Sequence, residues 1–254
     1  MARFAGVLID LDGVVYQKGA LIAGAAEALA LLGSHGLPYR IVTNTTSKPL
    51  SAILAELRKL KLAVDPRHVL TPALAARRII EADGLNPFNL VRPTLLEDLP
   101  AAKTGRQNAV VIADAGDDLN YKNLNAAFRL LEKGAVFLAL AGNRYFLDRD
   151  GELSLDVGAF VAALEYASGR SARVLGKPAA EFFHLAAEAI AIPTERTVMI
   201  GDDAEFDVHA AMAAGMAGVL VRTGKWKPGD DTRMTPPPTA IADTLLDAVR
   251  VIIG

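Results

Sequence analysis

The stretch Val7-Leu8-Ile9-Asp10-Leu11-Asp12-Gly13 decides the fold, because it joins a short apolar run to two carboxylates and a glycine. A run of this kind is typical of a strand that is buried on both faces, as in a parallel sheet. The glycine permits a sharp backbone turn directly after the strand. The stretch therefore predicts a buried strand with two acidic side chains at its carboxyl end, where open parallel sheets bind their ligands.

The same pattern recurs along the chain. Apolar runs of strand length alternate with segments whose apolar residues are three or four positions apart, which predicts an α/β fold with a parallel sheet. We expect strands at 7–9, 41–42, 109–112, 136–140, 198–200 and 219–221, and helices at 23–35, 49–61, 121–133, 180–191, 205–214 and 244–253.

A block from 78 to 173 carries its own alternation of strands and helix, and we interpret it as an inserted α/β domain. Its entry follows Thr71-Pro72, a favourable helix start, and its exit precedes Gly176-Lys177-Pro178. The remaining residues, 1–77 and 174–254, are then expected to form one core domain.

The composition excludes several classes of protein. Of 254 residues, 52% are hydrophobic and 22% are charged, which excludes intrinsic disorder. Lys plus Arg number 27 against 29 Asp plus Glu, so there is no basic excess for nucleic acid or anionic lipid. Without cysteine there is no disulfide, thiolate zinc site or cysteine nucleophile. With no signal peptide or bilayer-spanning stretch recognisable, we expect a cytoplasmic protein with no nucleic-acid or membrane partner.

The first two strand ends carry candidate phosphate chemistry. One carboxylate of the pair Asp10 and Asp12 could attack a phosphoryl centre while the other transfers a proton, although solvated turn residues are the alternative interpretation. Thr43 and Asn44 end the second strand before a helix N-terminus, where unpaired N–H groups favour phosphate. Helix capping explains the hydroxyls that follow, so Thr43 is the better phosphate candidate.

A lone cation and a cluster of acids come later. Lys177 precedes a predicted helix and could neutralise phosphoryl charge, although a lone lysine is usually just solvated. Asp202, Asp203 and Asp207 follow a buried strand, and carboxylates this close repel one another unless a cation joins them. Mg²⁺ prefers oxygen ligands and would suit the cluster together with Asp10. An acidic helix N-terminus is the alternative, but it does not require Asp202 at the strand end.

Other catalytic motifs are absent from the sequence or incomplete. There is no G-x-S-x-G sequence for a serine hydrolase, and the stretch 218–225 lacks the spacing and the hydroxyl residue of a P-loop. The four histidines are scattered, so no zinc site is indicated.

Taken in order, Asp10-x-Asp12-Gly13, Thr43-Asn44, Lys177-Pro178 and Gly201-Asp202-Asp203-x-x-x-Asp207 resemble the four motifs of the haloacid dehalogenase (HAD) superfamily. The inserted block between the second and third motifs resembles the C2a cap of the NagD-like phosphatases. Further stretches around 143–158 and 221–225 are similar to the phospholysine phosphohistidine inorganic pyrophosphate phosphatase group. The resemblance covers nearly the whole chain and implies a Rossmann-like core with a cap.

The resemblance also implies roles for these residues. Asp10 would be the nucleophile and, with Asp202 and the backbone carbonyl of Asp12, a Mg²⁺ ligand, while the Asp12 side chain would act as general acid and then base. Two further carboxylates, Asp203 and Asp207, would hold metal-bound water or orient the lysine. The phosphoryl oxygens would be gripped by Thr43, Asn44 and Lys177.

The substrate implied is a small phosphorylated compound, with phosphoramidates and pyrophosphate among the candidates. Two alternatives stay open: a NagD-like nucleotide or sugar monophosphatase, and a non-catalytic phosphate-binding regulatory module on the same fold. We expect the cap to select the substrate through Arg144, which opens a predicted hairpin at 144–152. The resemblance further implies a homodimer through the cap.

Overall fold

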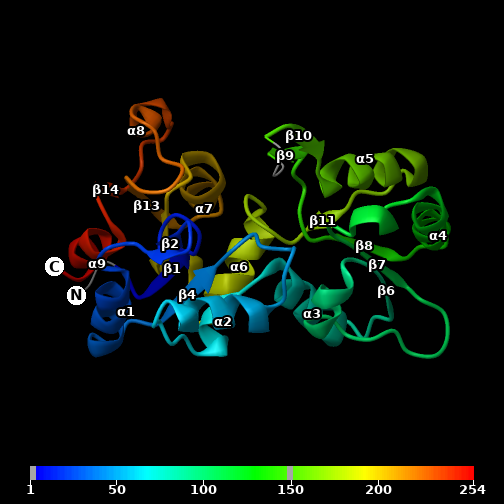
Figure 1. The fold of residues 1–254 in the computed structure, drawn as a ribbon, viewed down its shortest axis with the longest axis horizontal. Coiled ribbons are helices and arrows are strands. Elements are labelled where there is room, and N and C mark those ends of the chain that lie inside the picture. The colour runs from blue at the N-terminus through cyan, green and yellow to red at the C-terminus, as the bar shows by residue number, and fades with distance from the viewer. Residues whose placement is uncertain (1–3, 148–150) are drawn as a thin grey trace. The chain divides into compact units, whose positions relative to one another are not determined.

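The structure is a computed structural model that describes residues 4–147 and 151–254 (Figure 1). The chain forms two compact units. The first consists of Met1–Thr43, Leu54–Leu70 and Lys177–Gly254, and the second of Asn44–Ile53 and Thr71–Gly176. The insertion expected at 78–173 falls inside the second unit. Its role as a cap and its exact bounds stay predictions.

The first unit is built on a six-stranded sheet in the order β14-β13-β12-β1-β4-β5, with every neighbouring pair parallel. All five residues of the central strand β1 are buried, as expected for a strand covered on both faces. The parallel α/β fold predicted from the sequence is therefore confirmed. The strands are β1 (Gly6–Asp10), β4 (Tyr39–Val42), β5 (Val69–Leu70), β12 (Thr197–Gly201), β13 (Ala217–Val221) and β14 (Ala240–Ala242), beside a small hairpin of β2 (Tyr16–Gln17) and β3 (Ala20–Leu21).

Helices cover the strands of this sheet. Helix α1 packs against α9, and α6 packs against α7 and β1. No helix in residues 4–147 and 151–254 has the length and apolar character needed to cross a bilayer. The helices are α1 (Ala25–Ser34), α6 (Ala180–Glu188), α7 (Ala210–Ala213), α8 (Asp230–Arg233) and α9 (Leu245–Ile253), with short 3₁₀ turns at Pro66–His68 and Thr194–Arg196, while α2 (Leu50–Lys59) begins in the second unit and ends in the first.

One expected helix differs from the prediction. Instead of a continuous α-helix over 205–214, the chain forms a π-helical turn, η5 (Ala204–His209), before α7 begins. The carbonyl of Asp203 accepts a hydrogen bond from the N–H of Val208, five residues ahead, at 3.2 Å, and this wider turn inserts an extra residue. Such π turns occur frequently at functional sites.

The second unit contains a four-stranded parallel sheet in the order β11-β8-β7-β6. The strands expected at 109–112 and 136–140 are confirmed, although the second ends at Ala139. A hairpin also forms where one was expected at 144–152, and its strands pair 145–147 with 153–155. Residues 148–150 of the expected hairpin lie outside the described residues. The elements are α3 (Pro72–Ala82), β6 (Pro87–Leu90), β7 (Ala109–Ile112), α4 (Tyr121–Glu132), β8 (Val136–Ala139), β9 (Tyr145–Leu147), β10 (Leu153–Leu155), α5 (Val157–Ser168) and β11 (Arg173–Val174), with 3₁₀ turns at Pro93–Glu97 and Gly116–Asp118.

The arrangement of the first sheet determines where a ligand can bind. Strand β1 pairs with β12 on one side and with β4 on the other, so the loops that leave their carboxyl ends diverge. Open parallel sheets bind ligands in the crevice that such a divergence creates. The loops after β1, β12 and β13 contact one another at this edge.

Candidate functional site

Buried polar side chains gather at the carboxyl edge of the first sheet. They come from the ends of β1, β4 and β12, from the start of the segment before α6, and from η5. All of them are at most 7% exposed, which is unusual for groups that are charged or polar. They are Asp10, Thr43, Lys177, Asp202 and Asp207.

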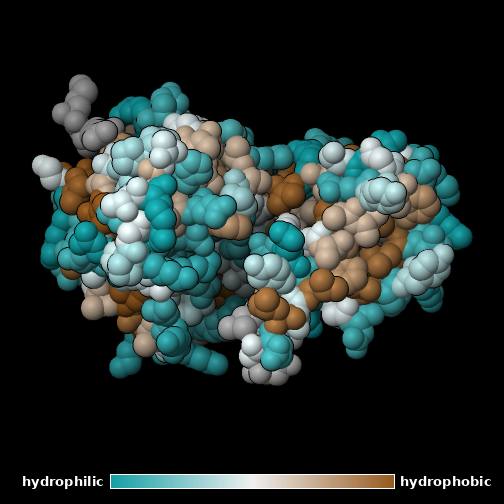
Figure 2. Space-filling view, turned by 90° about the horizontal axis from the view of Figure 1, so that it is seen from above, coloured by the Kyte–Doolittle hydropathy of each residue, from teal (hydrophilic) through white to brown (hydrophobic). Residues whose placement is uncertain are grey.

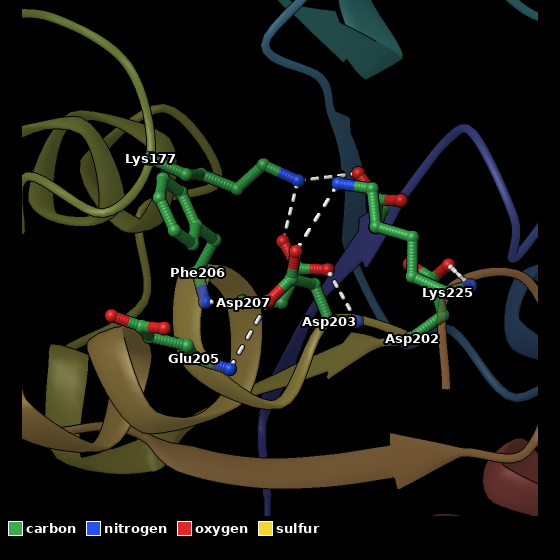
Figure 3. A network of polar contacts seen from close by, with 8 residues as sticks. Lys177, Asp202, Asp203, Glu205, Phe206, Asp207 and Lys225 are labelled. Carbon is green, nitrogen blue, oxygen red and sulfur yellow. Dashed lines mark hydrogen bonds and ion pairs between the residues drawn. The ribbon is translucent and has the colours of Figure 1, made fainter. Parts of the chain in front are cut away.

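Lys177 lies at the centre of this cluster. Its ammonium group donates a hydrogen bond to Oδ1 of Asp10 and another, of 2.6 Å, to Oδ1 of Asp207 (Figure 3). Burial alone would lower the pKa of Lys177, but the two carboxylates outweigh it, and the pKa is raised. The lysine is therefore a fixed positive charge between two acidic side chains.

At Asp10, in contrast to Lys177, the effect of burial on the pKa is not outweighed by neighbouring charges. Burial raises its pKa well above the usual value, Lys177 acts against this rise, and the nearby Asp207 and Asp202 add to it. Three carboxylates around one ammonium group leave an excess of negative charge in a buried place. A bound cation would offset that excess.

The three carboxylates can hold such a cation. One oxygen from each of Asp10, Asp202 and Asp207 lies within 4.8 Å of the others. Oδ1 of Asp202 is buried and has no hydrogen-bond partner in the described part of the chain, an arrangement that is unfavourable unless a ligand binds there. Burial raises the pKa of Asp202 to about 6, even though the N–H of Lys225 donates to its other oxygen. The donors are all carboxylate oxygens, which fits a hard cation such as Mg²⁺.

Asp207 and Asp203 differ from Asp202 in how their oxygens are used. Oδ1 of Asp207 accepts from Lys177, and Oδ2 accepts from the backbone N–H of Asp203 at 3.2 Å. Oδ1 of Asp203 caps η5 by accepting from the N–H groups of Glu205 and Phe206, and its Oδ2 lies 3.1 Å from Nζ of Lys225. Both carboxylates are thus engaged by donors from the protein.

A glycine allows Asp207 to reach this position. A Cβ atom at Gly201 would lie 2.3 Å from Cβ of Asp207, a distance that real atoms do not adopt. Because the π-helical turn η5 carries Asp207 back over the end of β12, the strand must end in a residue without a side chain.

The remaining sequence candidates are not part of the buried cluster. Asp12 is exposed, and its backbone forms an isolated bridge with that of Tyr16. Burial raises the pKa of the Tyr16 hydroxyl, and the nearby Asp12 carboxylate adds to this rise. Asn44 and the exposed Arg144 belong to the second unit, so their roles at the site stay predictions. Sequence reasoning overlooked Tyr16 as a partner of Asp12, and no motif indicated it.

Sequence reasoning also assigned no role to the loop after β13. The backbone N–H of Lys225 donates to Oδ2 of Asp202 at 2.6 Å, and the hydroxyl of Thr223 donates to the carbonyl oxygen of Gly13. The resemblance includes the stretch 221–225 without a role for it, and the glycine between these two residues, Gly224, has a φ of 56°.

Comparisons with known proteins identify the family of the chain. A family model described as haloacid dehalogenase-like hydrolase matches residues 7–104, and a HAD-hydrolase-like model matches residues 174–248. Phospholysine phosphohistidine inorganic pyrophosphate phosphatase from Homo sapiens is 38% identical over 260 residues, covering 100% of this chain and 96% of that protein. Haloacid dehalogenase-like hydrolase domain-containing protein 2 from Bos taurus is 40% identical, covering 97% of this chain and 95% of that protein.

Solved structures show the same fold. The 4-nitrophenylphosphatase from Thermotoga maritima superposes with a TM-score of 0.85 at 25% identity, and 98% of each chain is covered. NagD from E. coli superposes with a TM-score of 0.84 over 97% of this chain and 98% of its own, and at 22% identity this likeness concerns the fold alone. The sequence matches, the shared NagD-like fold and the buried acidic cluster together show that the chain belongs to the haloacid dehalogenase-like hydrolases and is a phosphatase of that family.

Proposed function

We propose that this protein is a Mg²⁺-dependent phosphohydrolase in which Asp10 accepts the phosphoryl group before water releases it. The observation that carries the proposal is the position of the Lys177 ammonium group between Asp10 and Asp207, next to the unpartnered Oδ1 of Asp202. Phosphoryl transfer depends mainly on positioning and on charge neutralisation. This cluster offers a carboxylate nucleophile, a fixed cation and a place for a metal ion.

The first step forms a bond from a carboxylate oxygen of Asp10 to phosphorus and breaks the bond to the leaving group. The leaving group departs with the electron pair and takes a proton from Asp12. Water then attacks the aspartyl phosphate, Asp12 takes its proton, and inorganic phosphate leaves with Asp10 restored. The exposure of Asp12 suits a group that must exchange protons with substrate and water.

Mg²⁺ would be held by the carboxylates of Asp10 and Asp202 with the backbone carbonyl of Asp12, and it supplies positive charge that offsets the carboxylates and the phosphoryl oxygens. The N–H of Gly13 donates to the carbonyl of Tyr16 at 2.8 Å, which fixes the peptide unit that carries the Asp12 carbonyl. Because both oxygens of Asp207 already accept protein hydrogen bonds, Asp207 orients Lys177, while Asp203 supports the site through its contacts to η5 and Lys225.

The phosphoryl oxygens would be gripped by Lys177, by the hydroxyl of Thr43 and by the side chain of Asn44. Thr43 is 2% exposed and directly follows β4, at the same edge as Asp10. Asn44 follows it in the chain, so two polar side chains leave the strand end together.

The substrate we propose is a small phosphorylated compound. The Homo sapiens relative is named for phospholysine, phosphohistidine and inorganic pyrophosphate, and the Thermotoga maritima structure is a 4-nitrophenylphosphatase. Phosphoramidates, pyrophosphate and aryl phosphates are therefore the first candidates. Nucleotide and sugar monophosphates are the alternative group.

We expect purified protein to release phosphate from at least one of these compounds when Mg²⁺ is present and to stop when a chelator is added. Ca²⁺, which takes more ligands at longer distances, should support little turnover. A colorimetric phosphate assay across 4-nitrophenyl phosphate, pyrophosphate, a phosphoramidate and a set of monophosphates measures this. Release that persists without metal contradicts the metal requirement, and no release from any compound favours a non-catalytic phosphate-binding module.

The same panel tests the part of Arg144 in substrate choice. If this exposed arginine contacts the substrate, Arg144→Ala changes the relative kcat/KM among substrates by about tenfold or more and leaves the Mg²⁺ requirement unaltered. Arg129→Ala, which removes an exposed arginine from α4 of the same unit, serves as the control. An equal loss for every substrate identifies Arg144 as structural.

We further propose a homodimer through the cap. Strands β9 and β10 expose apolar side chains: Leu153 is 65% exposed and Leu155 69%. Leu155 lies opposite Tyr145, which is 57% exposed, so the three side chains share one face of the hairpin. Figure 2 shows apolar side chains reaching the surface of the second unit. Exposed apolar patches of this kind mark contact surfaces.

We expect the wild-type protein to sediment as a dimer and Leu153→Glu to sediment as a monomer, because a charge in the centre of an apolar contact loses its hydration without gaining a partner. Val251→Glu is the matched control, since Val251 is 59% exposed on α9 in the first unit. A wild-type protein that is monomeric at micromolar concentration shows the dimer proposal to be wrong.

A further inference from the structure

The loop that leaves β13 reaches two other loops of the site. The N–H of Lys225 donates to Oδ2 of Asp202 at 2.6 Å, and the hydroxyl of Thr223 donates to the carbonyl oxygen of Gly13. Asp202 follows β12 and Gly13 follows β1, so one short segment connects the ends of three neighbouring strands. None of the four motifs identified in the sequence includes this segment.

Two glycines bring these loops into direct contact. A Cβ atom at Gly224 would lie 1.8 Å from Oδ2 of Asp202 and 2.7 Å from Cα of Gly13. A Cβ atom at Gly13 would lie 2.1 Å from the same oxygen. Both glycines also have positive φ angles, 88° at Gly13 and 56° at Gly224. The carboxylate of Asp202 is therefore enclosed by backbone that only glycine can provide at both positions.

This enclosure distinguishes the two oxygens of Asp202. Oδ2 is occupied by the N–H of Lys225 and surrounded by the two glycines, whereas Oδ1 is buried and has no partner within residues 4–147 and 151–254. The terminal torsion of an aspartate side chain is broad and roughly two-fold, so rotamer preference alone does not select one orientation. The contacts that the loop after β13 makes with Oδ2 do select one orientation of the carboxylate.

We propose that Thr223, Gly224 and Lys225 form a positioning loop that holds Asp202 with Oδ1 directed to the metal ion. The inference rests on the proposed function, because it assigns a task to residues around the metal ligand. Groups that orient a metal ligand typically contribute 10–100-fold to metal affinity. The loop acts through Asp202.

The positioning is carried by the backbone of residue 225 and not by its side chain. The ammonium group of Lys225 contacts Asp203 at 3.1 Å, and the side chain is 71% exposed. A surface ion pair of this kind contributes little. The hydroxyl of Thr223 ties the loop to the loop after β1 through a side chain, which makes Thr223 the position to test.

Thr223→Val removes the hydroxyl and keeps the shape of the side chain. We expect it to raise the Kd for Mg²⁺, measured by isothermal titration calorimetry without substrate, by about tenfold or more. Thr223→Ser keeps the hydroxyl and should restore binding close to that of wild type. Thr232→Val is the matched control, because the hydroxyl of Thr232 also donates to a glycine carbonyl, that of Gly229, at 2.9 Å.

Kinetics separates positioning from a general structural role. In Thr223→Val the Mg²⁺ concentration for half-maximal activity should rise in step with the Kd, while kcat at saturating Mg²⁺ recovers most of its wild-type value. A variant damaged only in its overall stability would instead show a lower melting temperature in the presence of chelator than Thr232→Val, with an unchanged Mg²⁺ requirement.

Gly224→Ala provides a second, steric test, since its Cβ must displace the Asp202 carboxylate. Gly36→Ala controls for backbone strain, because Gly36 has a similar φ of 63° and a Cβ there meets nothing within 4 Å. We expect weakened Mg²⁺ binding in Gly224→Ala and wild-type binding in Gly36→Ala.

The outcomes distinguish the two proposals. Weakened Mg²⁺ binding in Thr223→Val with normal binding in Thr223→Ser and Thr232→Val supports the positioning loop. If the wild-type protein binds Mg²⁺ and Thr223→Val binds it equally tightly, the positioning loop is refuted and the proposed function stands. If the wild-type protein itself binds no Mg²⁺, the proposed function is refuted together with the inference.

Discussion

Asp10→Asn folds and loses its phosphatase activity by about 10⁴-fold or more, the scale on which removal of a catalytic group acts in other enzymes. An amide oxygen is a poor nucleophile and cannot form the aspartyl phosphate, and the change also removes one carboxylate ligand of Mg²⁺. Folding survives because Lys177 keeps Asp207 as a partner at 2.6 Å, and because the change removes one of several mutually repelling carboxylates. Initial rates of phosphate release measure the loss.

Asp83→Asn makes the same chemical change at an exposed residue and is the control for the amide itself. Urea unfolding of both variants tests whether Asp10→Asn is folded under the assay conditions. Turnover near that of wild type in a folded Asp10→Asn protein would disprove the aspartyl-phosphate mechanism.

Lys177→Met is expected to lose both stability and activity. The substitution leaves Asp10 and Asp207 buried, at 5% and 1% exposure, without the ammonium group that pairs with them. Removal of one partner of a buried ion pair typically destabilises a protein by about 3–5 kcal/mol. Loss of one preorganised charge from a phosphoryl site should lower kcat by about 10²–10³.

Urea unfolding at neutral pH, with chelator and with Mg²⁺, tests the stability effect. Because the bound cation would neutralise part of the same negative charge, Mg²⁺ should restore more stability to Lys177→Met than to wild type. Lys225→Met is the control, since its ion pair with Asp203 is exposed and should contribute about 0–1 kcal/mol. If the two lysine variants unfold at the same urea concentration, Lys177 does not neutralise the buried carboxylates.

Most of the first unit could be predicted from local sequence. Strands such as β1 and β12 are short apolar runs, and burial on both faces of a parallel sheet requires that composition. Helices such as α1 and α9 follow from apolar residues at helical spacing. The π-helical turn η5 was not predictable in the same way, because its carbonyl contacts and the return of Asp207 depend on Gly201 and on the end of β12.

The candidate site shows the same division. The sequence by itself determined that carboxylates stand at the ends of two buried strands and that a lysine precedes the helix at 180–188, since residue type and position along a strand are local properties. Only the tertiary structure decided which groups meet. Lys177 lies 167 residues from Asp10 along the chain, and its choice of Asp10 and Asp207 follows from the order of the strands in the sheet.

The tertiary structure likewise decided which oxygen of Asp202 stays without a protein partner. That outcome depends on the N–H of Lys225 and on the close approach of Gly13 to Gly224, which are more than 200 positions apart in the sequence and adjacent only across the sheet edge. A carboxylate offers two chemically identical oxygens, so the sequence can name the ligand residue but cannot distinguish its oxygens. Packing of the surrounding backbone makes them different.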